Sequence, residues 1–575
     1  MKIALLHAPA YFSDYAAEIC ETWGLTCYQL IQEQDLASLS PTDIPALLLP
    51  AGHYDSASCE AIMAYVNTGG ALVCLCPQSE LSDPMGFTYV EDKTGHHRLR
   101  VTCPPAAGIA GTALPVVGKV KIYEPRDDAQ IRAWLGLLNT YEKNTPAIMS
   151  RQMGKGQVIC FSFDLLASVC QLRQGDPHLA EIIPPGDSCA RPCHLASDLG
   201  GADSGWVPFA DLQARLLVDT LIACLPAPVP LISHLPANAN AIILYSGDED
   251  SATRAEIEKQ FTDLTAENVR MNLYLIPDAS ASTREDAHQD GEHHDIGVHP
   301  DLLHLSGASI QDRVDEYRAQ LERFSEKFQL PLRSARNHCT AWAGYLELMV
   351  VAHACGLRMD SSYFTCSSYM RNRAYDPYGA FGMAMPMRFV QPTGEMIDIY
   401  EQPTHLSDDC WFQSGDDYSA DISPDIYDDI VERILTDQKT QYHMPYGVNI
   451  HPGNYARFSS EQSASLIRQS KALDLPIWSF DQWLDFVEAR RRWRISDWQW
   501  QNQQLRFTVQ GDTEHHALSL LLPAEHMGSR LKTVSVEDQP IAYKLITRYR
   551  QSVAELSLPP QKTFNVAANY ETKSA

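Results

Sequence analysis

The sequence predicts a multidomain α/β protein that ends in a small antiparallel β-sandwich. The chain has 575 residues, which is enough for three or four domains of ordinary size. Up to about residue 493, apolar strand-like runs alternate with amphipathic helix-like segments, a pattern typical of parallel sheets covered by helices. Beyond that point, short alternating segments separated by turn residues indicate an antiparallel sandwich over 494–575.

The first predicted domain, residues 1–228, is a doubly wound parallel α/β domain. Strands are expected at KIALLH, PALLLPAG, ALVCLCP and GKGQVICFSFDL, and helices at YAAEICETWG and CEAIMAYVNTGG. Residues 187–205 are expected to form a loop, followed by a helix at FADLQARLLVDTLIACL. The proline-rich run from Pro226 marks the end of the domain.

The second predicted domain, residues 229–493, opens with IILYSGDED, a buried strand that ends in Asp248 and Asp250. A buried carboxylate is costly unless it is paired or bound to a metal, so two of them at a strand end indicate a site. A plain turn is the alternative. Long amphipathic helices are expected at DRVDEYRAQLERFSEKF and FDQWLDFVEARRRW.

The bulk properties exclude several classes of partner. A formal net charge of −27 repels phosphate backbones, so no nucleic-acid partner is expected. No apolar run is long enough for a transmembrane helix, and the start lacks the pattern of a signal peptide. The 15 scattered cysteines lack zinc-finger spacing and suit buried thiols of a reducing compartment. We therefore expect a cytoplasmic protein, with an exported chain whose signal has been removed as the alternative, and leave a homo-oligomer open.

Four polar stretches follow the Asp248 strand: HHDIGVHPDLLH, ARNHCTAW, MDSSYF and YGVNIHPGNY. In this order, and together with the aspartate pair, they resemble the motifs of the polysaccharide deacetylase family (carbohydrate esterase family 4 and its relatives). The resemblance covers about residues 240–490. It implies a central distorted (β/α) barrel, with the site at the carboxyl ends of its strands.

The resemblance also implies catalytic roles. Asp248 matches the general base, Arg336 the arginine that pairs with the base, and His451 the general acid. A cation beside a carboxylate favours its charged form, and histidine titrates near neutrality, so both assignments suit acid–base work. The alternatives are a surface ion pair for Arg336 and a strand-end turn for the His-Pro pair at His451.

The implied metal ligands are Asp250, His299 and His304. Four residues separate the two histidines, where the family usually has three. Three further histidines are therefore fallback candidates: His293, His294 and His338. Two imidazoles and one carboxylate with open positions are typical of catalytic zinc. Zinc is the favoured divalent metal, and cobalt, nickel and iron stay open.

The substrate is expected to contact Trp342 and the DSSY stretch, in particular Asp360 and Tyr363. For the two aromatic residues, packing in the core is the alternative. The acidic run from Ser407 to Asp425 is expected to be a solvated loop or a rim of the substrate cleft.

The first domain resembles the class I glutamine amidotransferases over LLLPAGHYDS and AIMAYVNTGGALVCLCP. An active member needs a cysteine on a tight turn between glycines, which LVCLCPQS lacks. Cys74 and Cys76 are therefore expected to be buried strand residues, and the domain to be non-catalytic.

These inferences together predict a metal-dependent hydrolase. The favoured activity is deacetylation of an N-acetylated, or O-acetylated, sugar or polysaccharide. One alternative is a hydrolase of another small C–N bond, such as a cyclic ureide or formamide. The other is an inactive carbohydrate-binding protein that keeps the scaffold.

Overall fold

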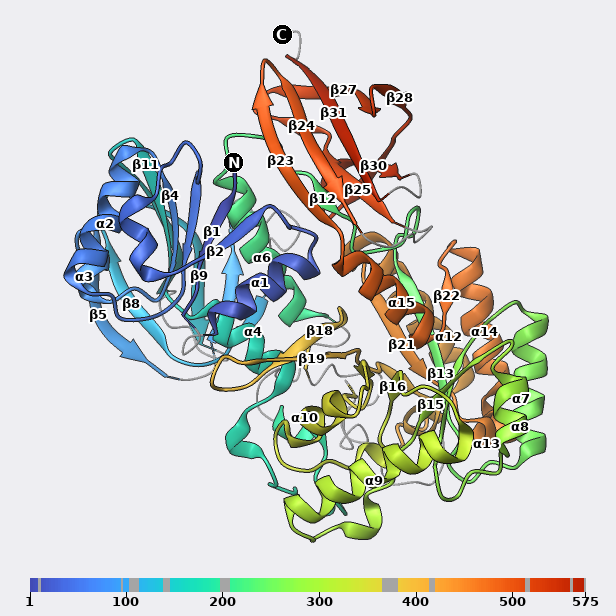
Figure 1. The fold of residues 1–575 in the computed structure, drawn as a ribbon. Coiled ribbons are helices and arrows are strands. Elements are labelled where there is room, and N and C mark those ends of the chain that lie inside the picture. Colours follow the sequence, from blue (N-terminus) through green and yellow to red (C-terminus); the bar gives the residue numbers. More distant parts are fainter. Residues whose placement is uncertain are drawn as a thin grey trace.

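The computed structural model describes most of the chain. The exceptions are residues 9–11, 95–96, 103–112, 138–144, 197–206, 365–380, 413–418, 512–517, 559–561 and 573–575. Part of the predicted loop at 187–205 and part of the acidic run therefore lie outside the described residues. Within the described part, the strands form two large sheets, two smaller antiparallel sheets and a two-stranded ribbon of β5 (Phe87–Lys93) and β8 (Val120–Pro125) (Figure 1).

The first large sheet has a parallel half and an antiparallel half. Its strands, in spatial order, are β2 (Tyr28–Ile31), β1 (Ile3–Leu6), β3 (Ala46–Leu49), β4 (Ala71–Leu75), β11 (Gly156–Phe161), β10 (Thr145–Met153), β9 (Gln130–Leu137), β6 (His97–Val101) and β7 (Ala113–Val116). The strands from β2 to β11 are parallel neighbours and include all four predicted strands. From β11 to β7 the neighbours are antiparallel, an extension that the sequence pattern does not predict.

Helices cover both faces of the parallel half. They are α1 (Ser13–Thr22), α2 (Ser56–Thr68), α4 (Leu165–Gln174) and α6 (Phe209–Ala223), with a short α3 (Ser79–Ser82). Alternate residues of β1 point to opposite faces, so Ile3 packs in the cluster that contains Ile19 of α1, and Ala4 in the cluster that contains Ile62 of α2. This alternation explains why β1 is apolar throughout, as a strand buried on both faces must be.

Cys76 departs from its predicted place in a strand. Cys74 lies within β4, but Cys76 follows the strand and has φ +47°, in the left-handed region. Its thiol is buried, and Sγ donates to the carbonyl oxygen of Ser162 at 3.3 Å. Burial raises the pKa of Cys76 well above its ordinary value, which opposes a nucleophilic thiolate.

The second large sheet is a curled half-barrel. Its strands, in spatial order, are β18 (Met387–Val390), β19 (Met396–Glu401), β17 (Met359–Asp360), β16 (Ser334–Ala335), β15 (Asp295–Val298), β14 (Asn272–Leu275), β13 (Ile242–Asp248), β21 (Pro445–Asn449) and β20 (Leu406–Ser407), with β22 (Ile477–Trp478) also on β13. All neighbours are parallel except β18 and β19. The implied distorted barrel is thus an open sheet whose edge strands, among the described residues, do not pair with each other.

The helices of this part lie outside the half-barrel (Figure 1). They are α7 (Arg254–Ala266), α8 (Arg284–Asp290), α9 (Ile310–Phe328), α10 (Glu347–Ala354), α12 (Pro424–Asp437), α14 (Ser460–Ala472) and α15 (Phe480–Arg491). The two predicted long helices are α9 and α15. Side-chain caps fix several starts, as where Thr253 accepts from the backbone N–H of Glu256.

Two antiparallel sheets follow, as the sequence pattern predicts. One contains β23 (Arg494–Gln501), β24 (Gln504–Gln510), β31 (Thr563–Thr572), β27 (Ser529–Val536) and β26 (Glu525–His526), with β28 (Gln539–Ile541) on β27. The other contains β12 (Leu231–Ile232), β25 (Ser519–Pro523), β30 (Gln551–Ser557) and β29 (Lys544–Arg548). Because β12 pairs with β25, the proline-rich stretch after Pro226 contributes an edge strand to the last sheet.

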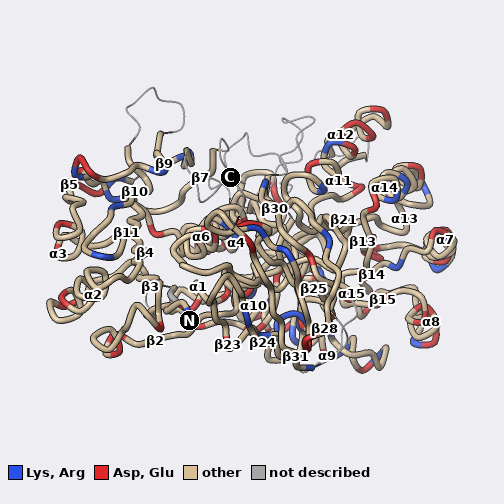
Figure 2. The backbone as a smooth tube through the Cα atoms, turned by 90° about the horizontal axis from the view of Figure 1, so that it is seen from above, with Lys and Arg blue, Asp and Glu red and all other residues tan. Residues whose placement is uncertain are grey.

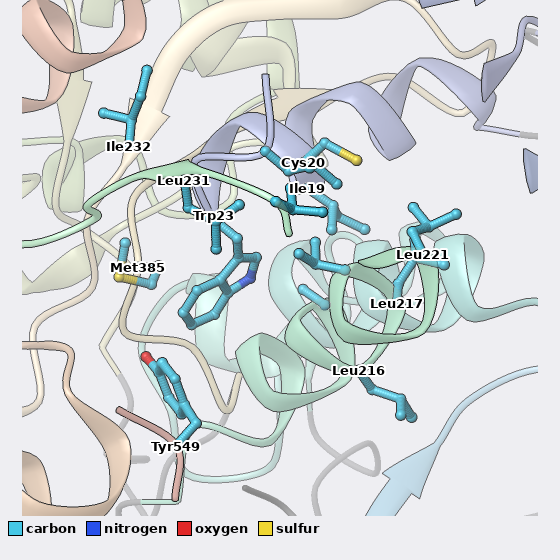
Figure 3. Close-up of a cluster of buried hydrophobic side chains, with 14 of the residues drawn as sticks. Ile19, Cys20, Trp23, Leu216, Leu217, Leu221, Leu231, Ile232, Met385 and Tyr549 are labelled. Atoms are coloured by element: carbon cyan, nitrogen blue, oxygen red, sulfur yellow. The ribbon is translucent and has the colours of Figure 1, made fainter. Parts of the chain in front are cut away.

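One hydrophobic cluster joins the first, middle and last parts of the chain. Trp23 at the end of α1 lies 5.5 Å from the ring of Tyr549 in an edge-to-face contact. Figure 3 shows these two side chains between α6, β12 and Met385. Beside this cluster, the buried carboxylate of Glu18 pairs with Arg388 and Arg491.

Charged residues are spread over the outer elements. In Figure 2 acidic and basic segments alternate along α7, α8, α12 and α14 and along the edge near β5. Within the described part of the chain, no helix combines the length and the apolar character needed to span a membrane.

Candidate active site

Several predicted site residues lie at the carboxyl ends of neighbouring strands of the half-barrel. Asp248 ends β13, His299 follows β15, and Arg336 follows β16. Parallel strands bring these ends to one edge of the sheet. Gly247 permits the close approach of β13 to the segment after β21, because a Cβ there would lie 2.4 Å from the carbonyl oxygen of Ile450.

Asp248 is held in place from two sides. Arg336 Nη1 donates to its Oδ1 at 3.0 Å, and Asn449 Nδ2 donates to its Oδ2 at 2.8 Å. The guanidinium of Arg336 is itself fully buried, and Nη2 also donates to Thr404 Oγ1 at 2.8 Å. Arg336 is therefore no surface ion pair. Its hydrogen bond orients the Asp248 carboxylate.

Asp250, His299 and His338 form a group whose ligand atoms all lie within 4.8 Å of one another. Asp250 Oδ1 lies 3.1 Å from His299 Nε2 and 3.7 Å from His338 Nε2. Asp250 has φ +46°, an uncommon conformation for a residue other than glycine, of the kind found at functional sites.

This group fits a divalent metal by its donor chemistry. His299 Nδ1 donates to the carbonyl oxygen of Arg336 at 2.5 Å, which leaves the Nε2 lone pair directed at Asp250. Nδ1 of His338 lies 3.2 Å from a carboxylate oxygen of Asp301, which is ion-pair distance without the geometry of a hydrogen bond. Two imidazole nitrogens and one carboxylate oxygen are the donor set of catalytic zinc sites.

The other candidate histidines lie elsewhere. His304 is exposed on a 3-10 turn, Leu303–Leu305, and is not in the group around Asp250. His293 is also exposed, and His294 is buried with its ring stacked on Phe261. Among the four histidines considered for the second position, the structure brings His338 to Asp250 and His299.

His451 forms a buried pair with Asp408, the first residue of α11 (Asp408–Phe412). His451 Nδ1 lies 2.6 Å from Asp408 Oδ1, and Ser459 Oγ donates to Asp408 Oδ2 at 2.7 Å. Asp408 belongs to the run expected to be solvated or a rim, yet it is completely buried. The sequence signal that could have identified it is a position directly after the short strand β20, because His299 and Arg336 also directly follow strands.

The far nitrogen of His451 faces the two strand-end carboxylates. Nε2 lies 3.5 Å from Asp250 Oδ2 and 3.8 Å from Asp248 Oδ2. Burial would lower the pKa of His451, but the carboxylates of Asp408, Asp250 and Asp409 outweigh it and raise the pKa well above its ordinary value. Burial likewise would raise the pKa of Asp250, and the neighbouring imidazoles instead hold it well below its usual range.

Asp248, Asp250 and His451 line a cavity of about 560 Å³. The half-barrel contributes Asp248, Asp250, Asn449 and His451 to its wall. A second hollow of about 240 Å³ shares Asp250, Asp409 and His451 with it. Asp250, Asp409 and His451 thus lie where the two depressions meet.

A segment of the first predicted domain completes the cavity. Six of its lining residues come from 185–193, which surrounds the short helix α5 (Pro192–Leu195). Arg191 Nη1 donates to the carbonyl oxygen of Cys339, next to His338, and the backbone N–H of Trp342 donates to Ala190 at 2.8 Å. The sequence pattern does not predict this contact, because the two segments are far apart in the chain and meet only in the folded state.

The predicted substrate contacts are not in the cavity. Trp342 is 2% exposed, and Asp360 and Tyr363 are fully buried. Trp342 and Tyr363 contact each other within the hydrophobic core, and Asp360 accepts from the hydroxyl of Ser362 at 2.6 Å. The aromatic residue that does line the cavity is Phe364, which directly follows Tyr363.

Comparisons with known proteins give similarities of fold at low identity. No protein-family model matches the chain, and no curated protein matches it. The carbohydrate deacetylase Agd3 is 10% identical, with 99% of this chain and 98% of that chain covered at a TM-score of 0.42. A putative polysaccharide deacetylase from Mycobacterium smegmatis is 13% identical, with 45% and 96% covered at a TM-score of 0.34. The exo-beta-1,4-mannosidase Op5Man5 from Opitutaceae bacterium strain TAV5 is 14% identical, with 29% and 32% covered at a TM-score of 0.24.

Proposed function

We propose that the chain is a metal-dependent hydrolase that removes acetyl groups from an N-acetylated, or O-acetylated, sugar or polysaccharide. The observation that carries the proposal is that one residue from each of three units, namely Asp250, Asp248 and His451, lines the same cavity. These units are the Asp250–His299–His338 donor group, the Asp248–Arg336 pair and the His451–Asp408 pair. Each is a recognised part of hydrolytic catalysis, and none has a structural reason to be beside the others.

Asp250, His299 and His338 would hold the cation, with zinc favoured by the ligand types. A bound divalent metal supplies Lewis-acid chemistry, activating water and polarising an acyl oxygen. His304, the first candidate from the spacing, is replaced by His338 in this proposal because His304 is exposed and outside the group.

Asp248 acts as the general base in this proposal. Its carboxylate is oriented by Arg336 and Asn449 and faces the cavity, where it can accept a proton from the attacking water.

His451 acts as the general acid. Its pKa is raised by the surrounding carboxylates, so the imidazole is protonated at neutral pH and can donate from Nε2 to a departing amine. Amines leave poorly without a proton, which makes this group specific support for amide rather than simple ester chemistry. Asp408 fixes the ring through Nδ1.

A sugar suits the shape and lining of the site. Phe364 gives an aromatic face at the wall of the 560 Å³ cavity, and the adjoining hollow extends the depression past His451. An aromatic face beside polar groups is a common platform for a pyranose ring.

The test is release of acetate from oligomers of an N-acetylated hexosamine by the purified chain. Acetate release that a chelator abolishes and added metal restores supports the proposal. Ammonia or formate released from a cyclic ureide or formamide, with no acetate, would indicate that the protein hydrolyses another small C–N bond. Glycan binding with neither metal nor turnover would support an inactive binding protein.

A further inference from the structure

A second cavity lies where the first part of the chain meets the last sheet. It has a volume of about 320 Å³ and shares no lining residue with the active-site cavity. Its walls come from α6, β12, β25 and the turn between β29 and β30. Leu231 and Tyr549, both in its lining, belong to the cluster drawn in Figure 3. A volume of this size holds a small organic ligand.

Arg548, in the wall of this cavity, is a buried cation without a carboxylate partner. Its side chain is 3% exposed, and among the described residues no Asp or Glu oxygen lies within ion-pair distance of it. Nη1 and Nη2 donate to uncharged acceptors, Asn240 Oδ1 and the carbonyl oxygen of Ala239, and Nε has no partner. Burying a charge without an opposite charge is unfavourable, so an anion in the cavity would be stabilised.

The other charged residues of the wall do not form an ion pair with Arg548. Arg215 is neutralised by Asp219 at 2.8 Å and lies over the ring of Tyr549 at 4.8 Å. Glu525 is exposed and lies at the rim. Glu555, the nearby buried acid, accepts from Ser519 and Asn238, and it attracts Arg548 only from beyond ion-pair distance.

We propose that this cavity binds a small monocarboxylate with an apolar body. The carboxylate lies toward Arg548, where it supplies a direct ion-pair partner for the guanidinium, whose Nε has no hydrogen-bond partner. The body packs on the apolar wall formed by Ile222, Val229, Leu231, Leu521 and Val553.

The charges of the lining residues favour a monocarboxylate over an ammonium ligand and over a phosphate or sulfate dianion. An ammonium ligand would meet Arg548 and Arg215 and be repelled. A phosphate or sulfate dianion needs several cationic donors, whereas one guanidinium here lacks an opposite charge and Glu525 adds a negative one. An aromatic carboxylate has the further advantage of the Tyr549 ring.

Benzoate is a suitable probe, because benzamide has the same shape and no charge. We expect calorimetry on the full-length protein to give saturable millimolar binding of benzoate, with benzamide at least about tenfold weaker, since charge-assisted hydrogen bonds are the stronger kind. Inorganic phosphate and benzylammonium are expected to bind more weakly than benzoate. The measurement needs neither metal nor turnover, so its result is independent of the proposed function.

Two variants locate the site. Ile222→Phe, at a half-buried position of the wall, fills the cavity and is expected to remove benzoate binding, whereas Leu545→Phe on the exposed face of β29 is the matched control. Arg548→Met is expected to bind benzoate and benzamide equally. The proposal is overturned if benzoate does not bind, if benzamide or phosphate binds as well as benzoate, or if Ile222→Phe keeps the wild-type affinity. Thermal unfolding confirms that each variant is folded.

Discussion

His451 Nδ1 lies 2.6 Å from Asp408 Oδ1, and Asp408 has no exposed surface. Ser459 and Asn454 donate to the same carboxylate, at 2.7 and 3.3 Å, so the Asp408 side chain is held in place without substrate. A histidine held in this way presents one defined nitrogen to the cavity, which is the arrangement that proton donation requires.

Asp408→Asn is expected to lower the hydrolysis of an N-acetylated sugar about 100-fold, because a general acid typically contributes this much or more. Hydrolysis of 4-nitrophenyl acetate should fall far less, since nitrophenolate departs without a proton. Steady-state rates on both substrates check this. Asp425→Asn, an exposed acid in the same run, is the control. Equal losses on the two substrates would assign Asp408 a purely structural role.

Arg336→Met should destabilise the protein by about 3–5 kcal/mol, because it leaves Asp248 buried and unpaired. Adding Asp248→Asn to Arg336→Met should recover part of this loss, since the uncompensated charge is then absent. Urea denaturation of both variants measures the difference, with the exposed Arg284→Met as the control. If the single and double variants unfold at the same urea concentration, the pair does not interact as described.

Asp360 predicts a pH dependence of stability. Burial raises its pKa to about 7, against the opposing hydrogen bonds from Ser362 and the charge of Arg336. An unfolded aspartate titrates near about 4, so the native state holds more protons between these values, and the free energy of unfolding falls as pH rises through this interval. In Asp360→Asn this decrease in the free energy of unfolding, on the order of 2–4 kcal/mol, should be absent. Denaturation at pH 5 and pH 8 tests it, and an unchanged slope in the variant would refute the assignment.

Arg191→Ala should weaken metal binding about tenfold, because outer contacts of ligands typically contribute that much. Arg191 reaches from the 185–193 segment to the carbonyl oxygen of Cys339, beside the proposed ligand His338. Competition with a chromophoric chelator measures the affinity, with Arg284→Ala as the control. Wild-type affinity in Arg191→Ala would show that this segment only covers the cavity.

The sequence predicts those parts of the site that strand ends determine. Asp248, Asp250, His299, Arg336 and His451 each lie at the end of a strand or within two residues after it, and the parallel sheet brings such positions together. The apolar runs likewise predict β1, β3, β4 and β11, because strands buried on both faces must be apolar throughout.

Other parts of the site depend on geometry that spacing does not reveal. His338 reaches Asp250 from a turn in which Cys339 and Thr340 both have positive φ, +48° and +51°, whereas the histidine at the expected spacing faces solvent. Asp408 occurs among acids that are typical of a solvated loop. Trp342 and Tyr363 are buried because they pack in the hydrophobic core, whereas the neighbouring Phe364 lines the cavity.

The most direct test of a cation bound by Asp250, His299 and His338 is the metal content of matched histidine variants. Wild type, His338→Gln and His304→Gln would be loaded with zinc, desalted and measured by elemental analysis. We predict one zinc per chain in wild type and in His304→Gln, and little in His338→Gln. Zinc retained by His338→Gln and lost from His304→Gln would contradict the proposed ligand set.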